Sequence, residues 1–331
     1  MADNRKGLWT KARMTALYTL SPLHFGVGQV AQAVDLPIAR DAATGFPVIP
    51  ASGVKGAARS ALKGKLSSDQ LAELFGPELS KGEQEARAGR LTFTEGRLVA
   101  YPMRALGQPF LYVTCPMILD RLRRDLTITG ADGQWRSWLG EPMPEVLTEE
   151  KAGITPAGAL DAPLVVEDLV YGDEEVARVP WLERAAALLA DLLPETEAFT
   201  RQRLRKYLVC LPDGDFGELM QRVVPVRART QLTDGKTTDA WVDPKTKEKQ
   251  KGNLWYEEYV PADALFVTFV GERRPGDGAT GNGSGLGLDA LVKQASSLEL
   301  IQIGGNETVG YGLCWWGGWQ PPAQSIAAGG A

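Results

Sequence analysis

The spacing of apolar and polar residues in the first quarter of the chain predicts alternating strands and helices. A mostly apolar, alternating run predicts a strand over residues 14–20, and a shorter apolar run predicts another over 46–49. Apolar or small residues recur along one side of a helix expected over 52–62. A second helix is expected over 68–75, because the Gly76-Pro77 pair that follows it favours termination.

The same patterns continue through the rest of the chain, with two exceptions. Strands are expected over 91–93, 98–103, 110–114, 264–270 and 298–302, and helices over 116–126, 181–193, 195–206 and 286–295. Residues 129–179 lack clear periodicity and are rich in Pro, Gly and acidic residues, which predicts a loop-rich insertion. Residues 317–331 are low in complexity, which predicts a disordered tail.

A long basic β-hairpin is predicted in the last third of the chain. Residues 222–231 and 253–260 have strand patterns and flank a polar excursion over 233–251. Residues 222–251 carry eight Lys or Arg against four Asp or Glu, a net charge of +4. With so few apolar residues between the arms, the tip is not expected to hold itself rigid.

Composition places the chain among globular proteins and excludes several chemistries. Of its 331 residues, 44% are hydrophobic and 23% charged, and no apolar run approaches the roughly 18 residues of a membrane helix. The N-terminal residues are polar, so we expect a cytoplasmic protein without a secretion signal. The three cysteines are far apart and predict no cysteine-based zinc site. A single histidine, His24, excludes mechanisms that need two, including the paired-imidazole ribonuclease mechanism.

The net charge alone argues against a nucleic-acid partner, but its distribution does not. The chain carries −5 in total. Residues 141–200 hold fourteen acidic side chains against three basic ones, which is −11, so the remaining residues together carry +6. The acidity is therefore local, and outside this segment the chain is mildly basic, so the net charge does not exclude a nucleic-acid partner.

A glycine-rich run and one lysine are candidate phosphate contacts. The run from Gly304 to Gly312 lies between two strand-like segments and lacks the Gly-Lys-Ser/Thr of a Walker A loop. Its glycines either bring backbone amides close to a phosphate or make a tight turn. Lys55 stands in the first turn of an expected helix, where it either joins an anion site or is simply solvated.

The loop that contains His24 also holds a candidate carboxylate. Pro37 favours extended backbone before it, which suits an exposed aspartate at Asp35. The alternative is that Asp35 caps a turn. His24 can either orient a phosphate or act structurally.

Together these runs resemble signatures of the RAMP superfamily, and their combination is similar to the backbone subunit of type III-B (Cmr) CRISPR effector complexes. The matching segments are 21–28, 34–40, 44–50, 54–59, 101–104, 112–116, 256–261 and 301–312. The last of them alone marks only the superfamily, whereas the first loop together with 112–116 and 256–261 marks this branch. The chain departs from the family pattern at 51–54 and at 41–43, where a second basic residue is replaced.

The resemblance implies an α+β fold with an RRM-like (ferredoxin-like) RAMP core, a helical insertion and a long β-hairpin thumb. It divides the chain into an N-terminal extension (1–13), a first core half (14–128), an acidic and helical insertion (129–220), the thumb (221–262), a C-terminal core part with the glycine-rich loop (263–316) and a tail (317–331). Copies of such a subunit are expected to stack head to tail along a CRISPR guide RNA, together with other Cmr subunits and without any membrane.

The resemblance also implies an endoribonuclease that cuts complementary target RNA beside each thumb. Asp35 corresponds to the family's catalytic carboxylate and would bind Mg²⁺ or another divalent cation, with His24 and Glu307 supporting catalysis or orienting phosphate. The expected RNA contacts are Arg40, Lys55, Arg59, Gly304, Gly305, Gly310, Arg227, Arg229 and Trp241. Two alternatives remain open: a guide-binding backbone without nuclease activity, and a free-standing RAMP ribonuclease that processes CRISPR precursor RNA.

Overall fold

The computed structural model describes residues 9–28, 33–78, 88–130, 133–147, 150–158, 160–230, 241–242, 249–250, 254–273 and 286–320, with backbone alone at 241–242, 249–250 and 320. Within these ranges no helix is both long enough and apolar enough to cross a membrane.

Helices and strands are mixed along the whole chain. The helices are α1 (Ala51–Ala61), α2 (Ser68–Phe75), α3 (Pro116–Thr129), α4 (Gly133–Gly140), α5 (Pro180–Ala190), α6 (Ala198–Tyr207), α7 (Asp213–Arg222) and α8 (Leu288–Ala295). The strands are β1 (Trp9–Thr19), β2 (Val48–Ile49), β3 (Leu91–Phe93), β4 (Gly96–Ala105), β5 (Gln108–Thr114), β6 (Ala152–Ile154), β7 (Leu164–Val166), β8 (Leu169–Tyr171), β9 (Val176–Arg178), β10 (Leu208–Cys210), β11 (Val226–Thr230), β12 (Trp241–Val242), β13 (Lys249–Gln250), β14 (Leu254–Glu258), β15 (Leu265–Arg273), β16 (Leu300–Gln302) and β17 (Leu313–Gln320). The mixture makes this an α+β protein.

The ends of α2 and α3 follow from the residues that stand there. The Ser67 hydroxyl accepts a hydrogen bond from the Gln70 amide at 3.2 Å, and the Gln70 side chain accepts one from the Ser67 amide at 2.9 Å. This reciprocal pair fixes the first turn of α2. α3 begins with Pro116, which suits the first helical position, and ends at Gly130, whose φ of 72° is the left-handed conformation that glycine adopts freely.

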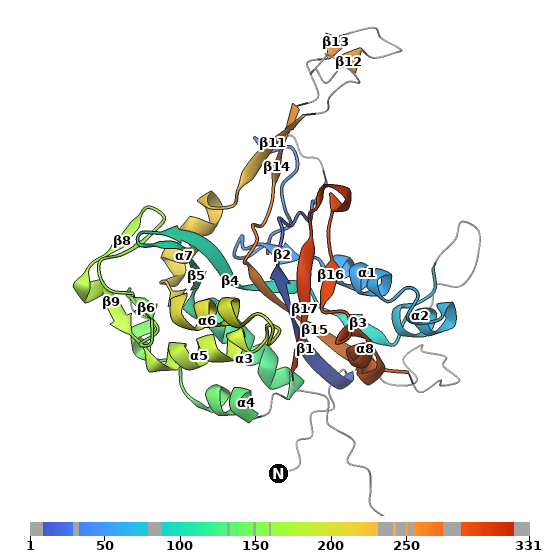
Figure 1. Cartoon of the computed structure of the whole chain (residues 1–331), viewed down its shortest axis with the longest axis horizontal. Coiled ribbons are helices and arrows are strands. Elements are labelled where there is room, and N and C mark those ends of the chain that lie inside the picture. The colour runs from blue at the N-terminus through green and yellow to red at the C-terminus, as the bar shows by residue number, and fades with distance from the viewer. Residues whose placement is uncertain are drawn as a thin grey trace, which may run out of the picture.

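One large, mostly antiparallel sheet runs through the body of the molecule (Figure 1). Its order is β16-β17-β1-β15-β4-β5-β10-β6-β9, with β2 and β7 on β4, β3 on β15, and β8 on β7. β1 pairs antiparallel with both β15 and β17, so segments from the two ends of the chain lie side by side. β10 lies in the segment that follows α3 and pairs parallel with β5. Strands of the insertion therefore extend the sheet beyond β5.

Two hydrophobic cores form because alternate residues of the central strands point to opposite faces of the sheet. In β1, Leu17 belongs to the first core and Tyr18 to the second. In β15, Phe266 belongs to the first core and Val267 to the second. A strand buried on both faces reads as an apolar run without alternation, as β15 does.

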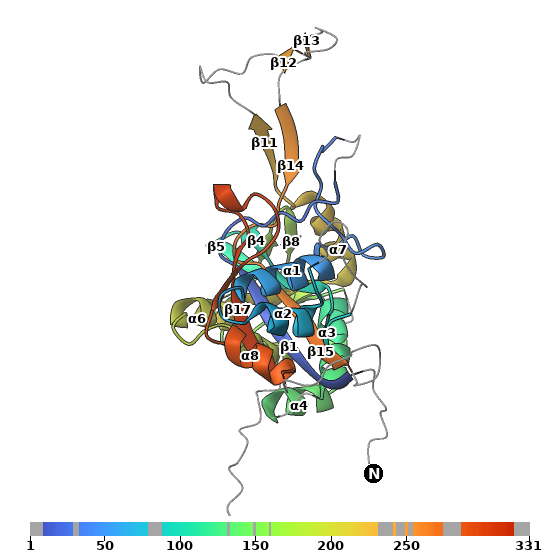
Figure 2. The same ribbon diagram turned by 90° about the vertical axis from the view of Figure 1, so that its right-hand side faces the viewer.

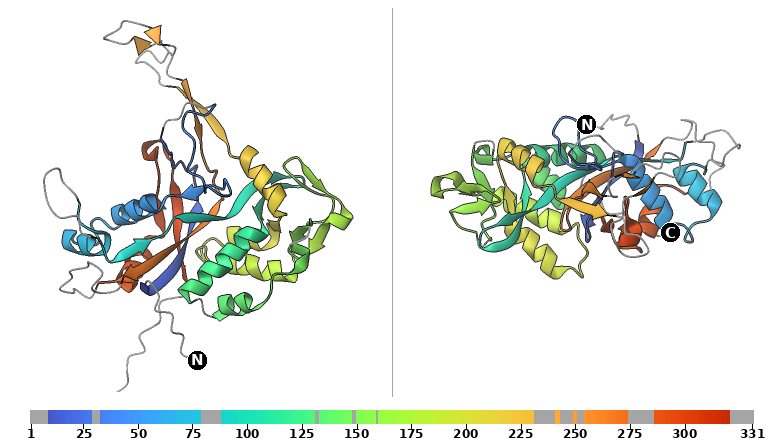
Figure 3. Two further views of the ribbon diagram at one scale, coloured as in Figure 1. Left: turned by 180° about the vertical axis from the view of Figure 1, so that it is seen from behind. Right: turned by 90° about the horizontal axis from the view of Figure 1, so that it is seen from above.

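Different helices cover the two cores. α1, α2 and α8 pack on the first core at one end of the molecule, on the right of Figure 1. α4, α5 and α6 pack on the second, and α3 lies along the sheet in the view from behind (Figure 3). The Arg123 guanidinium of α3 lies 5.7 Å from the ring centres of both Trp138 and Trp181, which ties α3 to α4 and α5.

A hairpin of β11 and β14 projects away from the body (Figures 1 and 2). Its antiparallel register pairs Val226 with Glu258 and Thr230 with Leu254. The short β12–β13 pair lies between its arms in the sequence. The predicted strand arms are thus confirmed, although their bounds are narrower than expected.

Several other predicted elements are confirmed, and α2 and β3 match their expected bounds. The expectation of a loop-rich segment over 129–179 is wrong. That segment contains α4 and the strands β6, β7, β8 and β9, each of three residues, which is too short to show a periodicity in sequence.

Two further expectations are corrected. Helix α7 was not expected, and it begins directly after Pro212, which sets the entry of the chain into the helix. The tail does not begin at residue 317, because β17 continues to Gln320. The reason is Trp319, which is buried and lies 5.6 Å from the Trp316 ring.

Candidate functional site

Glu257 is a buried carboxylate at the root of the hairpin, with an exposure of 1%. Its Oε2 lies 2.6 Å from Nε of Arg229 on the facing strand, in an ion pair. Its Oε1 accepts a hydrogen bond from the Asn306 side-chain amide and lies 3.5 Å from Nδ1 of His24. A buried charge is tolerated only when it is paired and hydrogen-bonded in this way. We call Glu257, Arg229, Asn306 and His24 the Glu257 cluster.

The Glu257 cluster joins three segments that are far apart in the sequence: the loop after β1, the hairpin, and the glycine-rich run between β16 and β17. The Gly305 amide donates to the His24 carbonyl oxygen at 2.9 Å, which holds the run against the loop. A Cβ added at Gly304 would lie 2.4 Å from the same oxygen, and Gly304 has a φ of +92°. Only glycine satisfies both conditions at this contact.

Glu258 points to the opposite side of β14 and attaches the first loop to it. Its carboxylate accepts hydrogen bonds from the Ile38 amide at 3.0 Å and from the Arg40 guanidinium at 3.1 Å. The Glu258 amide donates to the Leu36 carbonyl, and the Leu36 amide donates to the Tyr256 carbonyl, both at 3.0 Å. The loop therefore pairs with β14 as a short extra strand, and Figure 2 shows it rising beside β14.

Asp35 lies half-buried beside the hairpin root. Its Oδ2 accepts a hydrogen bond from the Tyr256 amide at 2.8 Å. Its Oδ1 has no hydrogen-bond partner among the described residues. One bond thus orients the carboxylate and leaves an oxygen available to accept a proton or bind a cation. The bond joins Asp35 to a distant strand and is not the turn cap that the sequence left open as an alternative, and the catalytic role of Asp35 stays a prediction.

His24 is held between the hairpin and the glycine-rich run. It is 7% exposed, and its Nδ1 lies 2.8 Å from the Glu258 carbonyl oxygen. Because a carbonyl oxygen only accepts, Nδ1 carries a proton. The Nε2 atom faces Gly26, where an added Cβ would lie 2.8 Å away. This geometry gives His24 a positioning role, and its part in catalysis stays a prediction.

Several backbone amides of the glycine-rich run donate to carbonyl oxygens, either within the run or in the loop after β1. The Gly310 amide donates to the Glu307 carbonyl at 3.0 Å, and the Gly312 amide donates to the Pro22 carbonyl at 2.8 Å. With the Gly305 amide also occupied, the run forms a tight turn and does not present these amides to a phosphate. The Glu307 side chain is exposed on this turn, and its supporting role stays a prediction.

Arg227 and Arg229 lie on the hairpin face that meets the glycine-rich run. Arg227 donates to the Tyr311 hydroxyl at 2.7 Å and lies 4.8 Å from the centre of the Tyr259 ring. Arg229 lies 4.7 Å from the centre of the Tyr311 ring. Ring contacts of this kind orient a guanidinium by its face and leave edge donors available. Arg227 remains exposed, so the hairpin root presents an oriented cation.

The two predicted cations of α1 have different surroundings. Arg59 donates to the Gly76 carbonyl and lies 3.6 Å from the Glu78 carboxylate, so it closes the end of α2. Lys55 is half-buried and has no hydrogen-bond or ion-pair partner among the described residues. Burial, Arg59 and Arg273 together lower the pKa of Lys55. An ammonium held among cations without a carboxylate is typical of an anion site.

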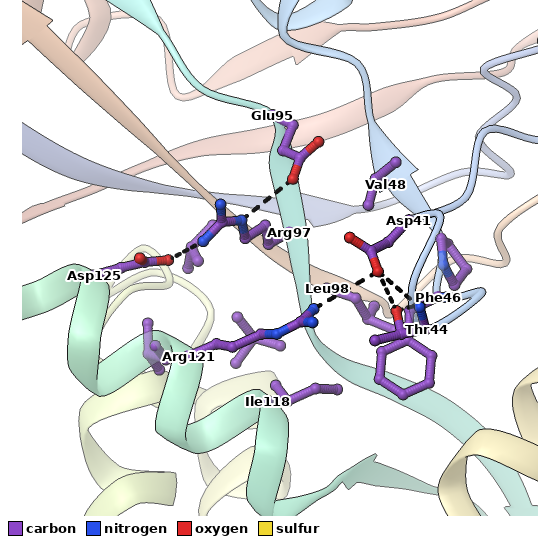
Figure 4. A pocket seen from close by; sticks show the side chains of 14 residues that line it. Asp41, Thr44, Phe46, Val48, Glu95, Arg97, Leu98, Ile118, Arg121 and Asp125 are labelled. Carbon is purple, nitrogen blue, oxygen red and sulfur yellow. Dashed lines mark hydrogen bonds and ion pairs between the residues drawn. The ribbon is translucent and has the colours of Figure 1, made fainter.

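A small pocket behind the first loop is lined by paired charges (Figure 4). Asp41 accepts hydrogen bonds from the Thr44 hydroxyl and amide, both at 2.8 Å, and faces Arg121 at 3.9 Å. Burial acts to raise the pKa of Asp41, but these bonds more than offset it and the pKa is lowered. Arg97 and Asp125 pair at 2.6 Å. At about 30 Å³ the pocket is too small for a nucleotide. Its paired charges join the loop to α3 through the contact between Asp41 and Arg121.

The remaining predicted residues are placed as follows. Arg40 donates to the Gly45 and Met220 carbonyls as well as to Glu258, so it braces the first loop. Trp241 begins β12, and its side chain lies outside the described residues. As RNA contacts both residues stay predictions.

Sequence reasoning missed Glu257, Glu258 and Asn306. The available signal was a pair of adjacent glutamates within one arm of a basic hairpin. Strand alternation sends such a pair to opposite faces, so each needs its own cation or donors.

The described residues contain no group of three or more His, Cys, Asp or Glu that could hold a metal ion. A dedicated metal cage of protein ligands is therefore absent from this part of the chain. Mg²⁺ is often bound by only one or two carboxylates, with phosphate and water completing its shell. The unpaired oxygen of Asp35 fits such a shared arrangement.

The chain matches the family model of the RAMP superfamily over residues 16–315. It is 29% identical to the Pyrococcus furiosus protein named CRISPR system Cmr endoribonuclease Cmr4, over 92% of this chain and 94% of that protein. It is 27% identical to the Saccharolobus solfataricus CRISPR system CMR subunit Cmr4, over 88% of this chain and 91% of that protein.

Solved structures with the same fold cover nearly the whole chain. The crystal structure of oligomeric Cmr4 from Pyrococcus furiosus has a TM-score of 0.65 and 25% identity, covering 94% of this chain and 98% of that one. A chain of the type III-B Cmr-beta complex bound to cognate target RNA has a TM-score of 0.66 and 20% identity, covering 95% of this chain and 98% of that one. The second likeness concerns the fold alone.

Replacing Glu257 with Ala should destabilise the free chain by about 2–3 kcal/mol, because Arg229 and Asn306 lose their buried partner. Urea unfolding monitored by tryptophan fluorescence measures the change. Glu307→Ala, which removes an exposed glutamate from the adjoining run, is the matched control. Equal losses in the two variants would contradict the role given to the Glu257 cluster.

Replacing Lys55 with Met should stabilise the free chain by roughly a few tenths of a kcal/mol, because a partly buried ammonium no longer faces two guanidiniums. With its pKa lowered in the folded state, Lys55 binds its proton more tightly when unfolded. Stability of the wild type should thus rise with pH in the alkaline range, and the variant should lose this dependence.

The same variant should bind RNA less tightly, with a salt dependence whose slope falls by about 0.7 for a single-stranded guide. Lys63→Met removes the same charge where it pairs with Glu78 at 3.1 Å, and it should show neither gain in stability nor loss of slope. A Lys55→Met chain that binds RNA like the wild type would exclude Lys55 from the RNA surface.

Proposed function

The chain belongs to the RAMP superfamily, and from that premise we propose that it is the guide-RNA-binding backbone subunit of a type III-B (Cmr) effector complex and that it also cleaves complementary target RNA. The relatives named Cmr4, one of them an endoribonuclease, support this assignment over nearly the full chain. The observation that carries it is the position of Asp35, whose carboxylate is bonded to the hairpin root through the Tyr256 amide at 2.8 Å.

We infer that the body is an RRM-like core and that the β11–β14 hairpin is the thumb. The support for a thumb is its projection from the body and its basic character in sequence (Figure 1). Copies of this chain assemble into oligomers in this proposal, and the crystal structure of oligomeric Cmr4 from Pyrococcus furiosus supports it. A contact that repeats head to tail makes an open filament, which suits a subunit that follows a linear RNA.

The guide RNA is bound through phosphates rather than through base edges. Lys55 lacks an anionic partner in the described chain, and Arg227 is an exposed, ring-oriented cation. Both properties favour contacts to phosphate, which carry no sequence information. A guide whose sequence varies from one RNA to the next requires contacts of this kind.

Cleavage begins with the 2′-hydroxyl of a target nucleotide beside the hairpin root. Its oxygen attacks the adjacent phosphorus while the proton passes to Oδ1 of Asp35, the oxygen without a partner in the described chain. The bond to the 5′-oxygen breaks, and that oxygen takes a proton from water. The hydroxide that is left takes the proton from Asp35, which restores the carboxylate. The products are a 2′,3′-cyclic phosphate and a 5′-hydroxyl. In this proposal His24 positions the first loop and Glu307 positions the adjoining turn of the glycine-rich run.

A divalent cation, Mg²⁺ or a similar ion, is proposed as the cofactor. When bound, it would neutralise the charge that builds on the phosphate. Asp35 is the residue that would hold it, through a water molecule of the ion, so that Oδ1 could still accept the proton. The hydrogen bond from Tyr256 keeps the carboxylate oriented whether or not the ion is present.

Replacing Asp35 with Asn should lower the rate of target cleavage by about 10²–10⁴-fold while guide binding changes less than about twofold. The asparagine retains an acceptor for the Tyr256 amide and loses only the charge. Single-turnover cleavage of a labelled target by the assembled complex measures the rate. Asp41→Asn, a loop carboxylate that caps a turn, is the control and should cleave normally. Wild-type cleavage by the Asp35→Asn complex would favour the purely structural alternative.

Deleting residues 235–250 should leave the melting temperature within a few degrees of the wild type, because this polar segment contains few apolar residues that a core could bury. The regular spacing of target cuts should be lost, because the thumb is what separates one guide–target linkage from the next. Thermal melting and a product ladder on the same variant check the two expectations. A ladder that is unchanged would show that this segment is not the thumb.

A further inference from the structure

The exit turn, residues 261–264, joins the hairpin to the body, because it lies between the end of β14 and the start of β15 (Figure 1). The Thr19 hydroxyl accepts a hydrogen bond from the Ala264 amide at 2.8 Å, and the Thr19 carbonyl accepts one from the Asp263 amide at 2.7 Å. Thr19 is the last residue of β1, and the loop that carries Asp35 begins at the next residue. The hairpin and this loop therefore leave the sheet at the same place.

Asp263 has a backbone conformation that few residues other than glycine adopt. Its φ is +71°, in the left-handed region, where Asn and Asp are tolerated better than other side chains. A residue keeps such a conformation only where its surroundings hold it there. The holding contact is a hydrogen bond of 2.6 Å from the Tyr18 hydroxyl to Oδ1 of Asp263. The exit turn is thus fixed by a side-chain bond as well as by its backbone bonds.

A second tyrosine sets the direction of the Tyr18 hydroxyl. The hydroxyl oxygens of Tyr18 and Tyr112 lie 2.8 Å apart, and the two residues are 1% and 0% exposed. A carboxylate oxygen only accepts, so Tyr18 donates to Asp263 and Tyr112 donates to Tyr18. Burial raises the pKa of Tyr112 to about 12, so this donor keeps its proton at neutral pH. We call Tyr112, Tyr18 and Asp263 the Asp263 network.

The hydroxyls of the Asp263 network do more than fill the core. A phenylalanine ring would pack in the same buried space at either tyrosine, whereas a buried hydroxyl is unfavourable unless it is hydrogen-bonded. Here each hydroxyl has a partner, and the series of bonds ends on the half-buried carboxylate of the exit turn. Tyr112 also begins the segment 112–116, a sequence motif that has no part in the RNA site described above. The network therefore connects this motif to the base of the hairpin.

We propose that Asp263, Tyr18 and Tyr112 are positioning residues, which set the direction in which β14 leaves the body and, through β14, the place of Asp35. The Tyr256 amide of β14 holds the Asp35 carboxylate at 2.8 Å, so a change of angle at the exit turn moves the catalytic group. A displacement of about 1 Å can lower a reaction rate by about 10²-fold. The effect on cleavage rests on the proposed function, whereas the effect on the hairpin does not.

Two substitutions at Asp263 separate its hydrogen bond from its backbone conformation. Asp263→Asn keeps an acceptor for Tyr18 and tolerates the left-handed φ, whereas Asp263→Gly keeps only the φ. For Asp263→Gly in the assembled complex, we expect the single-turnover rate constant at saturating target to fall by about 10–100-fold, while guide affinity and the half-saturating target concentration change less than about twofold. Asp263→Asn should cleave like the wild type. Wild-type cleavage by Asp263→Gly, or an equal loss in Asp263→Asn, would overturn the proposal.

Tyr18→Phe tests the other end of the same bond and should reproduce the kinetics of Asp263→Gly. Its matched control is Tyr171→Phe, because the Tyr171 hydroxyl donates to the Asp215 carboxylate at 2.6 Å within the insertion. The control also loses a tyrosine–aspartate bond, but it should keep the wild-type rate constant. Equal losses in the two variants would show a general effect of stability and contradict a positioning role.

A distance measurement on the free chain tests the positioning without relying on cleavage. Spin labels are placed on Leu254→Cys in β14 and on Ile128→Cys in α3, at positions that are 57% and 60% exposed, and the three native cysteines are buried. Pulsed electron paramagnetic resonance should show a shifted or broader distance distribution with Asp263→Gly than with Asp263→Asn. Identical distributions would overturn the proposal. A shift in a protein whose wild-type complex cuts no target RNA would support the positioning and refute the proposed function.

Discussion

The burial of the Glu257 carboxylate is the constraint on which the rest of the site depends. A charge with 1% exposure must be met by partners, and the chain supplies them from three distant segments: Arg229 from the facing strand, Asn306 from the glycine-rich run and His24 from the first loop. The contacts of Glu257 therefore fix the hairpin, the first loop and the glycine-rich run relative to one another. The same arrangement positions Asp35. Glu258, the residue after Glu257 in β14, binds the first loop, and Asp35 lies in that loop.

The two-residue period of β-strands explains both the two cores of the fold and the arrangement of side chains on the hairpin. In the central strands it sends alternate residues into two separate cores, so β1 and β15 hold the helices on both faces of the sheet. In the hairpin it separates Arg227, Arg229 and Glu257 from Val226, Leu254 and Tyr256. One side meets the glycine-rich run with cations stacked on tyrosines. The other side presents these three exposed apolar side chains together with the Glu258 carboxylate, which holds the first loop.

Sequence patterns predicted those helices and strands whose boundaries are set by neighbouring residues. α2 matches its expected bounds because Ser67 and Gln70 cap it within one turn, and β15 was evident as an apolar run. The strands of the insertion were not predictable, since three residues carry no periodicity. In the site, sequence motifs indicated Asp35 and Lys55 but not Glu257, whose partners lie up to 233 positions away in His24. Arg59 was expected on RNA, yet only the packing of α2 reveals its bond to the Gly76 carbonyl.

We propose that target RNA is cut where Asp35 meets the hairpin root, and a crosslink from Tyr256 tests this most directly. The Tyr256 amide is bonded to Asp35 at 2.8 Å, while its side chain is 43% exposed and can be replaced by a photoreactive phenylalanine derivative. Crosslinked and cleaved positions are then mapped on the same target RNA in the assembled complex. We expect Tyr256 to crosslink to a nucleotide adjoining the scissile phosphate, at every cut in the series. Crosslinks confined to the guide, or to target nucleotides midway between cuts, would contradict it.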